Sequence, residues 1–463
     1  MSLLWTGVLA LGVVAFGWLY WKFPREVFLS AVFFMPFFFV FERWGLHLST
    51  TEIFFSVLIL VWLIKSWLER KEFSLDLPVL LPVLLVVGVS FAAVFVAPYR
   101  RPALRETIQL VWIFALFYFF ANQLAKGEVA VKEVAVLLVP ASALLVFYGF
   151  FQYIFCTGPL YYHIAPNRMR AYATFGQPNP YATYLLIVIF LALGLLSNPR
   201  GKRRNRIWLA LGLLLAGLVT TFSQAGYVGL IGGLATFLLL KKRAGFRAAT
   251  ITTLLLAALI GASILDLRII SPRRAPHRGD KGYFVRDLAR KRNLLETSAL
   301  PFGQSYARIY SHKQRIIFAK SALRMWKAHP ILGVGPGNYA PLFPEYTTEP
   351  VEKNPEIVHS APLQVAAETG TVGLIAFATL AGAFFSVGLA LYRHLKQGPL
   401  KDLSVGLLSA YVAVLVNSLF GWPLTFGVQE PFVLTIAMLV AIGKITREKQ
   451  GPEIPEGLTP KST

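Results

Sequence analysis

The sequence predicts an all-α integral membrane protein with about 12–13 transmembrane helices and one long, partly helical periplasmic loop. Of the 463 residues, 56% are hydrophobic and only 15% are charged, whereas about a quarter of the residues in a soluble domain are charged. Apolar runs of about 16–22 residues recur along the chain, and an α-helix of about that length crosses the ~30 Å hydrocarbon core of a bilayer.

Each predicted span follows from one apolar run. The first has no basic residues before it and no small-residue cleavage site, so we expect a retained helix rather than a signal peptide. In chain order the spans are 3–21, 26–41, 53–68, 78–97, 107–124, 133–153, 180–197, 207–222, 226–240, 249–265, 364–392, 404–422 and 430–443.

These spans divide the chain into five parts. The predicted parts are N-terminal transmembrane helices (1–165), central transmembrane helices (166–265), a long periplasmic loop (266–363), C-terminal transmembrane helices (364–445) and a cytoplasmic tail (446–463).

Basic residues predict the orientation. Lys and Arg gather in Arg200–Arg206, Lys241–Arg247, Arg393–Lys401 and the tail after Lys444, and such short basic loops stay in the cytoplasm. The net charge of +22 is therefore attributed to loops that meet anionic membrane lipids, not to nucleic acid binding. We expect a multi-pass protein of the cell inner membrane.

Four segments then share the outer, periplasmic face: Arg100–Arg105, 154–178, Ser223–Tyr227 and the loop 266–363. Binding and catalytic residues concentrate on loops held by a rigid scaffold, so we expect the functional site there. The spans carry few ionisable residues at mid-depth, which disfavours a proton-coupled transporter.

No motif indicates a metal or a cofactor. The chain has one cysteine, Cys156, and lacks the His-Glu-x-x-His and Asp-x-Asp patterns, so we expect metal-independent chemistry without a cofactor. The run Gly333–Gly337 lacks the Lys-Ser/Thr of a P-loop, and we interpret it as a tight turn.

His359 is the first candidate catalytic residue. Ser360 is a suitable N-cap and Pro362 is tolerated in a first helical turn, so His359 lies just before a helix. The positive end of the helix dipole favours a neutral imidazole, which can act as a base near pH 7. Gln364 and Glu368 continue a polar stripe from Ser360. The alternative is that this stripe faces water and His359 only ends a loop.

Arginines are the candidate anion-binding groups. Arg315 opens a predicted helix, Gln314–Lys327, and Arg168 and Arg170 lie in the outer loop 154–178. Guanidinium groups bind pyrophosphate through paired hydrogen bonds. The alternatives are a solvated Arg315 and loop arginines that meet lipid phosphates.

Three sequence elements carry a resemblance to a known family. They are Arg170-Ala-Tyr-Ala-Thr-Phe-Gly-Gln-Pro-Asn-Pro180, Arg315…Trp326…His329-Pro-Ile-Leu-Gly-Val-Gly-Pro-Gly-Asn-Tyr339, and His359-Ser-Ala-Pro-Leu-Gln-Val-Ala-Ala-Glu-Thr-Gly370. In this order they resemble the motifs of the O-antigen ligase family, the Wzy-C type membrane glycan ligases and polymerases. The resemblance covers roughly residues 165–440.

The resemblance implies a glycosyltransferase of the cell envelope, as in lipopolysaccharide biosynthesis. Such enzymes move a glycan from undecaprenyl pyrophosphate to an acceptor hydroxyl on a glycolipid, glycan or protein, without metal and with inversion. It implies His359 as general base and Arg315 as the catalytic residue that holds the pyrophosphate. The predicted substrate-binding residues are Arg168, Arg170, Asn179, Gln224, Asn338, Gln364 and Glu368.

One position departs from the family pattern. The segment Thr221-Phe-Ser-Gln-Ala-Gly226 resembles the family element Thr-x-Ser-Arg-Gly-Ala, so Gln224 stands where an arginine is expected. Glutamine donates hydrogen bonds but carries no charge, and Arg170 is the first candidate to compensate. The alternatives are a polysaccharide polymerase or a protein O-oligosaccharyltransferase of the same family, and a non-catalytic binder or transporter of lipid-linked glycans.

Overall fold

The computed structural model has helices along nearly all of its described chain. The described residues are 3–43, 46–70, 79–125, 128–159, 162–165, 168–196, 201–265, 306–349, 355, 357–422 and 427–450. Part of the predicted long loop, 266–305, and most of the predicted tail lie outside the described residues.

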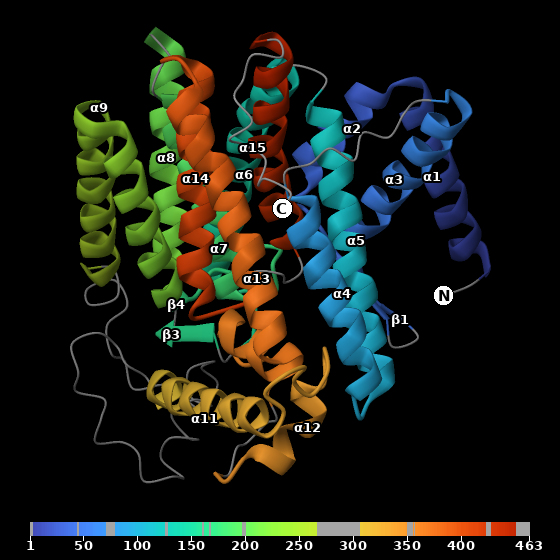
Figure 1. The fold of residues 1–463 in the computed structure, drawn as a ribbon. Helices are drawn as coiled ribbons and strands as arrows, with labels where there is room; N and C mark the ends of the chain where they lie inside the picture. Colours follow the sequence, from blue (N-terminus) through green and yellow to red (C-terminus); the bar gives the residue numbers. More distant parts are fainter. Residues whose placement is uncertain are drawn as a thin grey trace.

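The helices form one bundle (Figure 1). They are α1 (Leu3–Lys22), α2 (Pro24–Phe34), α3 (Thr50–Leu68), α4 (Leu80–Val96), α5 (Arg100–Leu124), α6 (Glu128–Phe155), α7 (Pro178–Leu196), α8 (Gly201–Thr220), α9 (Gln224–Leu265), α11 (Tyr306–Ala328), α12 (Tyr339–Tyr346), α13 (Ala361–His394), α14 (Pro399–Ser418) and α15 (Gln429–Gln450). Two antiparallel pairs join strands β1 (Val40–Arg43) and β2 (Leu46–Ser49), and β3 (His163–Ala165) and β4 (Arg168–Met169).

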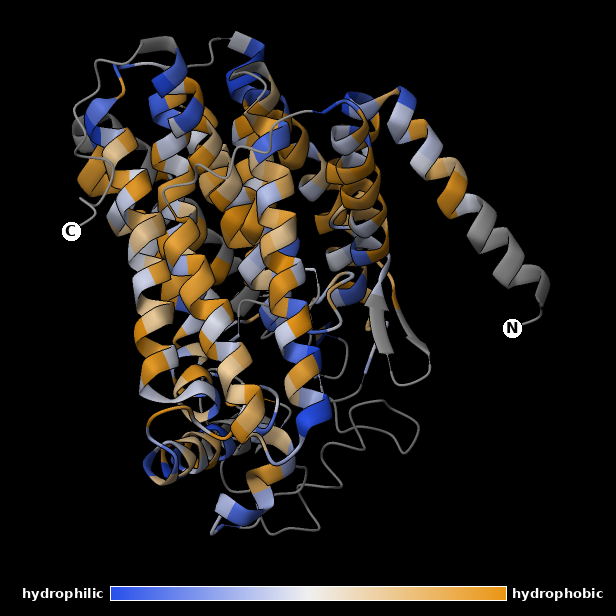
Figure 2. Cartoon of the chain, turned by 45° about the vertical axis from the view of Figure 1, so that its right-hand side comes forward, coloured by the Kyte–Doolittle hydropathy of each residue, from blue (hydrophilic) through white to orange (hydrophobic). Residues whose placement is uncertain are grey.

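Eight helical segments of the described chain are long and apolar enough to cross a membrane, which confirms an all-α membrane protein. They are Thr50–Leu68, Arg100–Leu124, Ala130–Phe155, Pro178–Leu196, Gln224–Lys241, Ala361–His394, Pro399–Ser418 and Gln429–Glu448, and the apolar helix Leu80–Val96 is slightly shorter. Hydrophobic residues run along the middle of the bundle and hydrophilic ones gather at its ends (Figure 2).

Helices also cover the other predicted spans, but with differences. α2 has only 11 residues, and α8 begins with the basic run 201–206. The helix assigned as α9, Gln224–Leu265, covers both predicted spans, 226–240 and 249–265, which the sequence predicted to be joined by Lys241–Arg247. Its first part, Gln224–Lys241, is by itself long and apolar enough to cross a membrane.

Small residues let the central helices approach closely. α7 is buried along most of its length and packs on α14. A Cβ atom on Gly406 of α14 would lie 2.8 Å from the Cα of Gly194 and 2.6 Å from the carbonyl oxygen of Phe190, both on α7. Such close backbone contacts supply the packing that holds helices together within lipid.

One end of the bundle, which we call the loop end, carries β3, β4, α11 and α12 (Figure 1). α11 lies across this end rather than along the bundle. The start of α5 and the 162–171 segment join the same end, because Tyr99 hydrogen-bonds to Asn338 and the Ala171 amide donates to the Thr220 carbonyl. The described parts of the four segments that the sequence assigned to one face therefore lie at the same end of the bundle.

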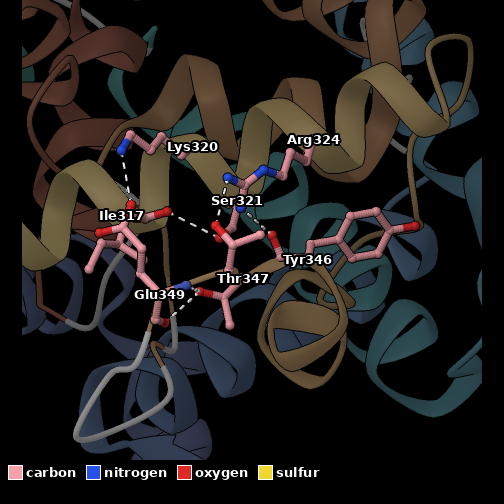
Figure 3. Close-up of polar contacts among 8 residues, drawn as sticks. Ile317, Lys320, Ser321, Arg324, Tyr346, Thr347 and Glu349 are labelled. Carbon is pink, nitrogen blue, oxygen red and sulfur yellow. Dashed lines mark hydrogen bonds and ion pairs between the residues drawn. The ribbon is translucent and has the colours of Figure 1, made fainter.

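A second hydrophobic core fixes α11 and α12 to α13. It contains Phe318, Ala322, Met325, Val334, Tyr339, Leu342, Phe343, Val358 and Ala367. Polar contacts add to it on the outer side of α11 (Figure 3): Lys320 pairs with Glu349 at 2.9 Å, and Arg324 donates to the Tyr346 carbonyl at 2.8 Å. α11 is therefore anchored on two of its faces.

Candidate functional site

His359 occupies the turn that leads into α13. Its φ of 60° lies in the left-handed region, which costs a residue with a Cβ roughly 1–2 kcal/mol. The turn is held on both sides, because the Val358 amide donates to Gln364 Oε1 at 2.7 Å and the Gln364 amide donates to the Ser360 carbonyl at 2.9 Å. Ser360 is the N-cap residue of α13, but its side chain makes no cap hydrogen bond. Backbone strain that the surrounding structure maintains is typical of functional sites.

The His359 ring lies against α11. It stacks on Phe318 with 6.3 Å between ring centroids and 25° between planes. Arg315 precedes Phe318 by three residues, about one helical turn. Burial, reinforced by the positive charge of Arg315, lowers the pKa of His359 to about 4. The structure thus brings both predicted catalytic residues together and keeps the imidazole neutral at pH 7.

Arg315 is itself half-buried. Burial lowers the pKa of its guanidinium, which nevertheless remains protonated in proteins. A cation held away from water attracts an anion more strongly than a solvated one does. Arg315 is therefore suited to hold a phosphate group beside His359.

The polar stripe of α13 faces protein rather than open water. Gln364 is only 6% exposed and hydrogen-bonds to the backbone just before His359. One turn further on, Glu368 Oε1 accepts the Tyr339 amide at 3.2 Å. These two side chains connect α13 to the His359 turn and to the start of α12.

The glycine run Gly333–Gly337 forms the tight turn that its sequence predicts. All three glycines have positive φ, between 65° and 96°. A Cβ atom on Gly335 would lie 2.3 Å from the Cβ of Ala97, and one on Gly337 would lie 2.8 Å from Cγ of Glu106. The run is wedged against the α4–α5 connection, where a larger residue does not fit.

Asn338 closes this turn. Its side chain is fully buried; Oδ1 accepts the Tyr99 amide at 2.9 Å, and Nδ2 donates to the carbonyls of Tyr99 and Pro336. The amide thus ties the start of α12 to the start of α5. Its predicted contact with substrate stays a prediction.

The remaining predicted residues form a second group at the loop end. Arg170 Nε donates to the Thr221 carbonyl at 2.8 Å, and its Nη2 donates to Asn179 Oδ1 at 3.2 Å. Arg168 lies over the Tyr153 ring at 5.5 Å. Gln224 is exposed at the first position of α9, so its side chain is accessible to a ligand.

A polar cavity of about 400 Å³ lies beside the His359 turn. Arg101, Arg105 and Glu106 line it from α5, Gln364 and Glu368 line it from α13, and Trp422 completes the polar set. The sequence placed Arg100–Arg105 at the outer face but gave no reason to choose Arg101, Arg105 or Glu106, and it gave no signal for Trp422. Only the fold brings them to Gln364.

Within the described residues, no group of three or more His, Cys, Asp or Glu side chains is arranged to hold a metal ion. The metal-independence of the reaction stays a prediction.

The comparisons with known proteins give one finding. No curated protein matches the chain. A family model described as O-antigen ligase matches residues 209–378, a segment that contains Gln224, Arg315, the glycine turn and His359. Over this segment the chain is similar to the O-antigen ligase family that its motifs resemble.

Proposed function

We propose that this protein is a metal-independent glycosyltransferase that moves a glycan from an undecaprenyl-pyrophosphate carrier to an acceptor hydroxyl, at the periplasmic face of the inner membrane. The family match supports glycan transfer of the O-antigen ligase type in general. The observation that carries the specific proposal is the neutral His359 imidazole beside the half-buried Arg315.

In the proposed reaction His359 takes the proton from the acceptor hydroxyl. The acceptor oxygen then forms a bond to the anomeric carbon, and the bond from that carbon to the pyrophosphate oxygen breaks. The electron pair leaves with the pyrophosphate, and Arg315 stabilises the negative charge that develops there. The proton on His359 passes to solvent or to the released pyrophosphate, which restores the neutral base.

Donor binding also makes His359 a stronger base. In the unliganded protein the charge of Arg315 helps to lower the pKa of His359. A bound pyrophosphate offsets that charge, so the pKa of His359 rises towards the reaction pH. A catalytic base is most effective when its pKa lies near the working pH.

The second group positions the donor in this proposal. Asn179 and Gln224 lie at the N-terminal ends of α7 and α9, and helix N-termini attract anions. Arg170, which follows β4, is held beside them by its hydrogen bond to Asn179. Arg168 extends the positive surface on β4. The acceptor determines whether the reaction is ligation to a glycolipid, polymerisation of a glycan or transfer to a protein hydroxyl.

The test uses purified full-length protein, a defined undecaprenyl-pyrophosphate glycan and a panel of acceptors, with products identified by mass. We expect a glycosylated acceptor from the wild type and from His329→Ala, and little product from His359→Ala. His329 is a matched control because it is an exposed histidine on the same side of the bundle, bonded to the Tyr346 hydroxyl. Donor binding without product, for every acceptor, would instead favour a non-catalytic binder, the alternative suggested by the neutral Gln224.

A further inference from the structure

The polar cavity adjoins a second, apolar cavity, because three residues line both. The second cavity has a volume of about 180 Å³ and is lined mainly by aliphatic and aromatic side chains of α4, α5, α13, α14 and α15. Glu106, Glu368 and Trp422 line both cavities. A polar cavity at the loop end thus borders an apolar cavity between the helices.

The polar cavity presents positive groups to an anion. Arg101 and Arg105 stand one turn apart at the start of α5, and both side chains reach the cavity. The first turn of α5 contains no acidic residue, and its N-cap residue, Tyr99, makes no side-chain cap. The free amides of this helix start therefore add to the attraction of the two guanidinium groups.

The two glutamates that line the polar cavity already interact with neighbouring groups. Glu106 Oε1 lies 4.0 Å from Arg105 Nε, and Glu368 accepts the Tyr339 amide. Both stand at the junction with the apolar cavity, where they can accept hydrogen bonds from hydroxyl groups. Of the groups that line the polar cavity, Glu106 also most directly repels an anion bound beside Arg105.

We infer that the two cavities form one binding site for an anionic lipid, with its phosphate group on Arg101 and Arg105 and the first part of its hydrocarbon chain in the apolar cavity. The inference rests on the proposed function only in expecting the lipid pyrophosphate as the natural occupant. In this site Arg101 and Arg105 supply the positive charge that Gln224 lacks. Arg170 instead bonds to Thr221 and Asn179, and Arg168 lies over the Tyr153 ring.

Binding of undecaprenyl pyrophosphate and of the uncharged alcohol undecaprenol to the full-length protein, in neutral detergent micelles, tests the phosphate part of the site. We expect the pyrophosphate to bind more tightly, and the double variant Arg101→Gln/Arg105→Gln to weaken its binding by at least about 10-fold, because charge-assisted hydrogen bonds are lost. The matched control is Arg203→Gln/Arg204→Gln, which changes two exposed arginines at the start of α8, at the end of the bundle opposite the loop end.

Two single variants make the result independent of folding. Glu106→Gln removes the carboxylate beside Arg105 and is expected to tighten pyrophosphate binding, a gain that a damaged protein cannot show. Val89→Phe narrows the apolar cavity and is expected to weaken binding of both lipids. Leu84→Phe, at an exposed position of the same helix, is its control.

Competition with phosphatidylglycerol separates the two lipid sources. If it displaces undecaprenyl pyrophosphate at equal concentration, the site takes anionic lipids generally; if it does not, the site is selective for the donor. Unchanged binding in the arginine double variant, or equal binding of undecaprenol and its pyrophosphate, would overturn the inference. Because no glycan or acceptor is present, a failure of transfer in the earlier experiment would leave this result unaffected.

Discussion

At the scale of single residues, the environment of His359 determines how it can act. Its ring stacks on Phe318, and both burial and the charge of Arg315 lower its pKa. An imidazole in this setting stays neutral well below pH 7. The sequence predicted the neutral state from the helix dipole, whereas the structure adds burial and Arg315 as the main causes.

The pH dependence of transfer follows from this environment. The free enzyme loses its base only when His359 gains a proton, so we expect kcat/KM to stay level as pH falls from 8 and to decline as the pH approaches the pKa of about 4. An ordinary histidine would cause a decline near pH 6.5. In Arg315→Ala the pKa should rise, because the opposing charge is removed, so the residual activity should decline at a higher pH.

His359→Ala is expected to reduce kcat by about 10²–10⁴-fold, the usual contribution of a general base, with donor affinity maintained. Steady-state kinetics and a donor-binding assay on the same preparation separate the two effects. Near-normal turnover of His359→Ala at saturating acceptor would show that His359 only ends the loop.

Gln364 is expected to act as a positioning residue. Gln364→Leu leaves the Val358 amide buried without its partner, which costs about 1–3 kcal/mol, and lets the His359 turn relax. We expect kcat to fall by about 10-fold or more while donor affinity changes little. Thr379→Val is the control on the same helix, because this exposed hydroxyl bonds only to the Ile375 carbonyl. A lower donor affinity with unchanged kcat would contradict the positioning role.

At the scale of elements, the loop end depends on how closely the glycine turn approaches α4 and α13. Gly370 interrupts α13 with a φ of 67°, and the Thr371 amide donates to the Pro330 carbonyl at 2.8 Å. The glycine turn Gly333–Gly337 therefore packs against the kink in α13, and α12 begins directly after this turn. Trp326 of α11 adds a bond to Thr371.

Gly335→Ala tests this close approach. The new Cβ would meet Ala97 at 2.3 Å in a backbone with φ of 96°, so we expect a loss of unfolding free energy of about 1–3 kcal/mol or more. Thermal unfolding in detergent measures the effect. Gly382→Ala is the control, since a Cβ on this α13 glycine has nothing within 4 Å and alanine favours helix. Equal melting temperatures for both variants would show that the glycine turn does not need the close approach to Ala97.

At the scale of the whole molecule, the loop end and the opposite, basic end of the bundle predict an orientation. Cysteine accessibility in cells, on a Cys156→Ala background, measures it directly; Cys156 is the one cysteine of the sequence and is buried. We expect Lys320→Cys and Ile331→Cys, both exposed at the loop end, to be labelled from outside. Arg203→Cys should be labelled only after permeabilisation. Labelling of both ends from the same side would invalidate the predicted topology.

Much of this architecture was predictable because its causes are local in the sequence. Apolar runs predicted the helices, and the three motifs predicted the family that matches residues 209–378. The Ser360-Ala-Pro start of α13 placed His359 just before a helix, as the structure shows.

The sequence by itself determined the membrane class, the family and the choice of His359 and Arg315. Only the tertiary structure placed α11 across the bundle, joined Tyr99 to Asn338 over 239 residues of chain, and assembled Arg101 and Arg105 with Gln364 and Trp422 around one cavity. The reason is physical: hydropathy and helix capping act between neighbours in the chain, whereas cavities and buried hydrogen bonds arise where distant segments meet.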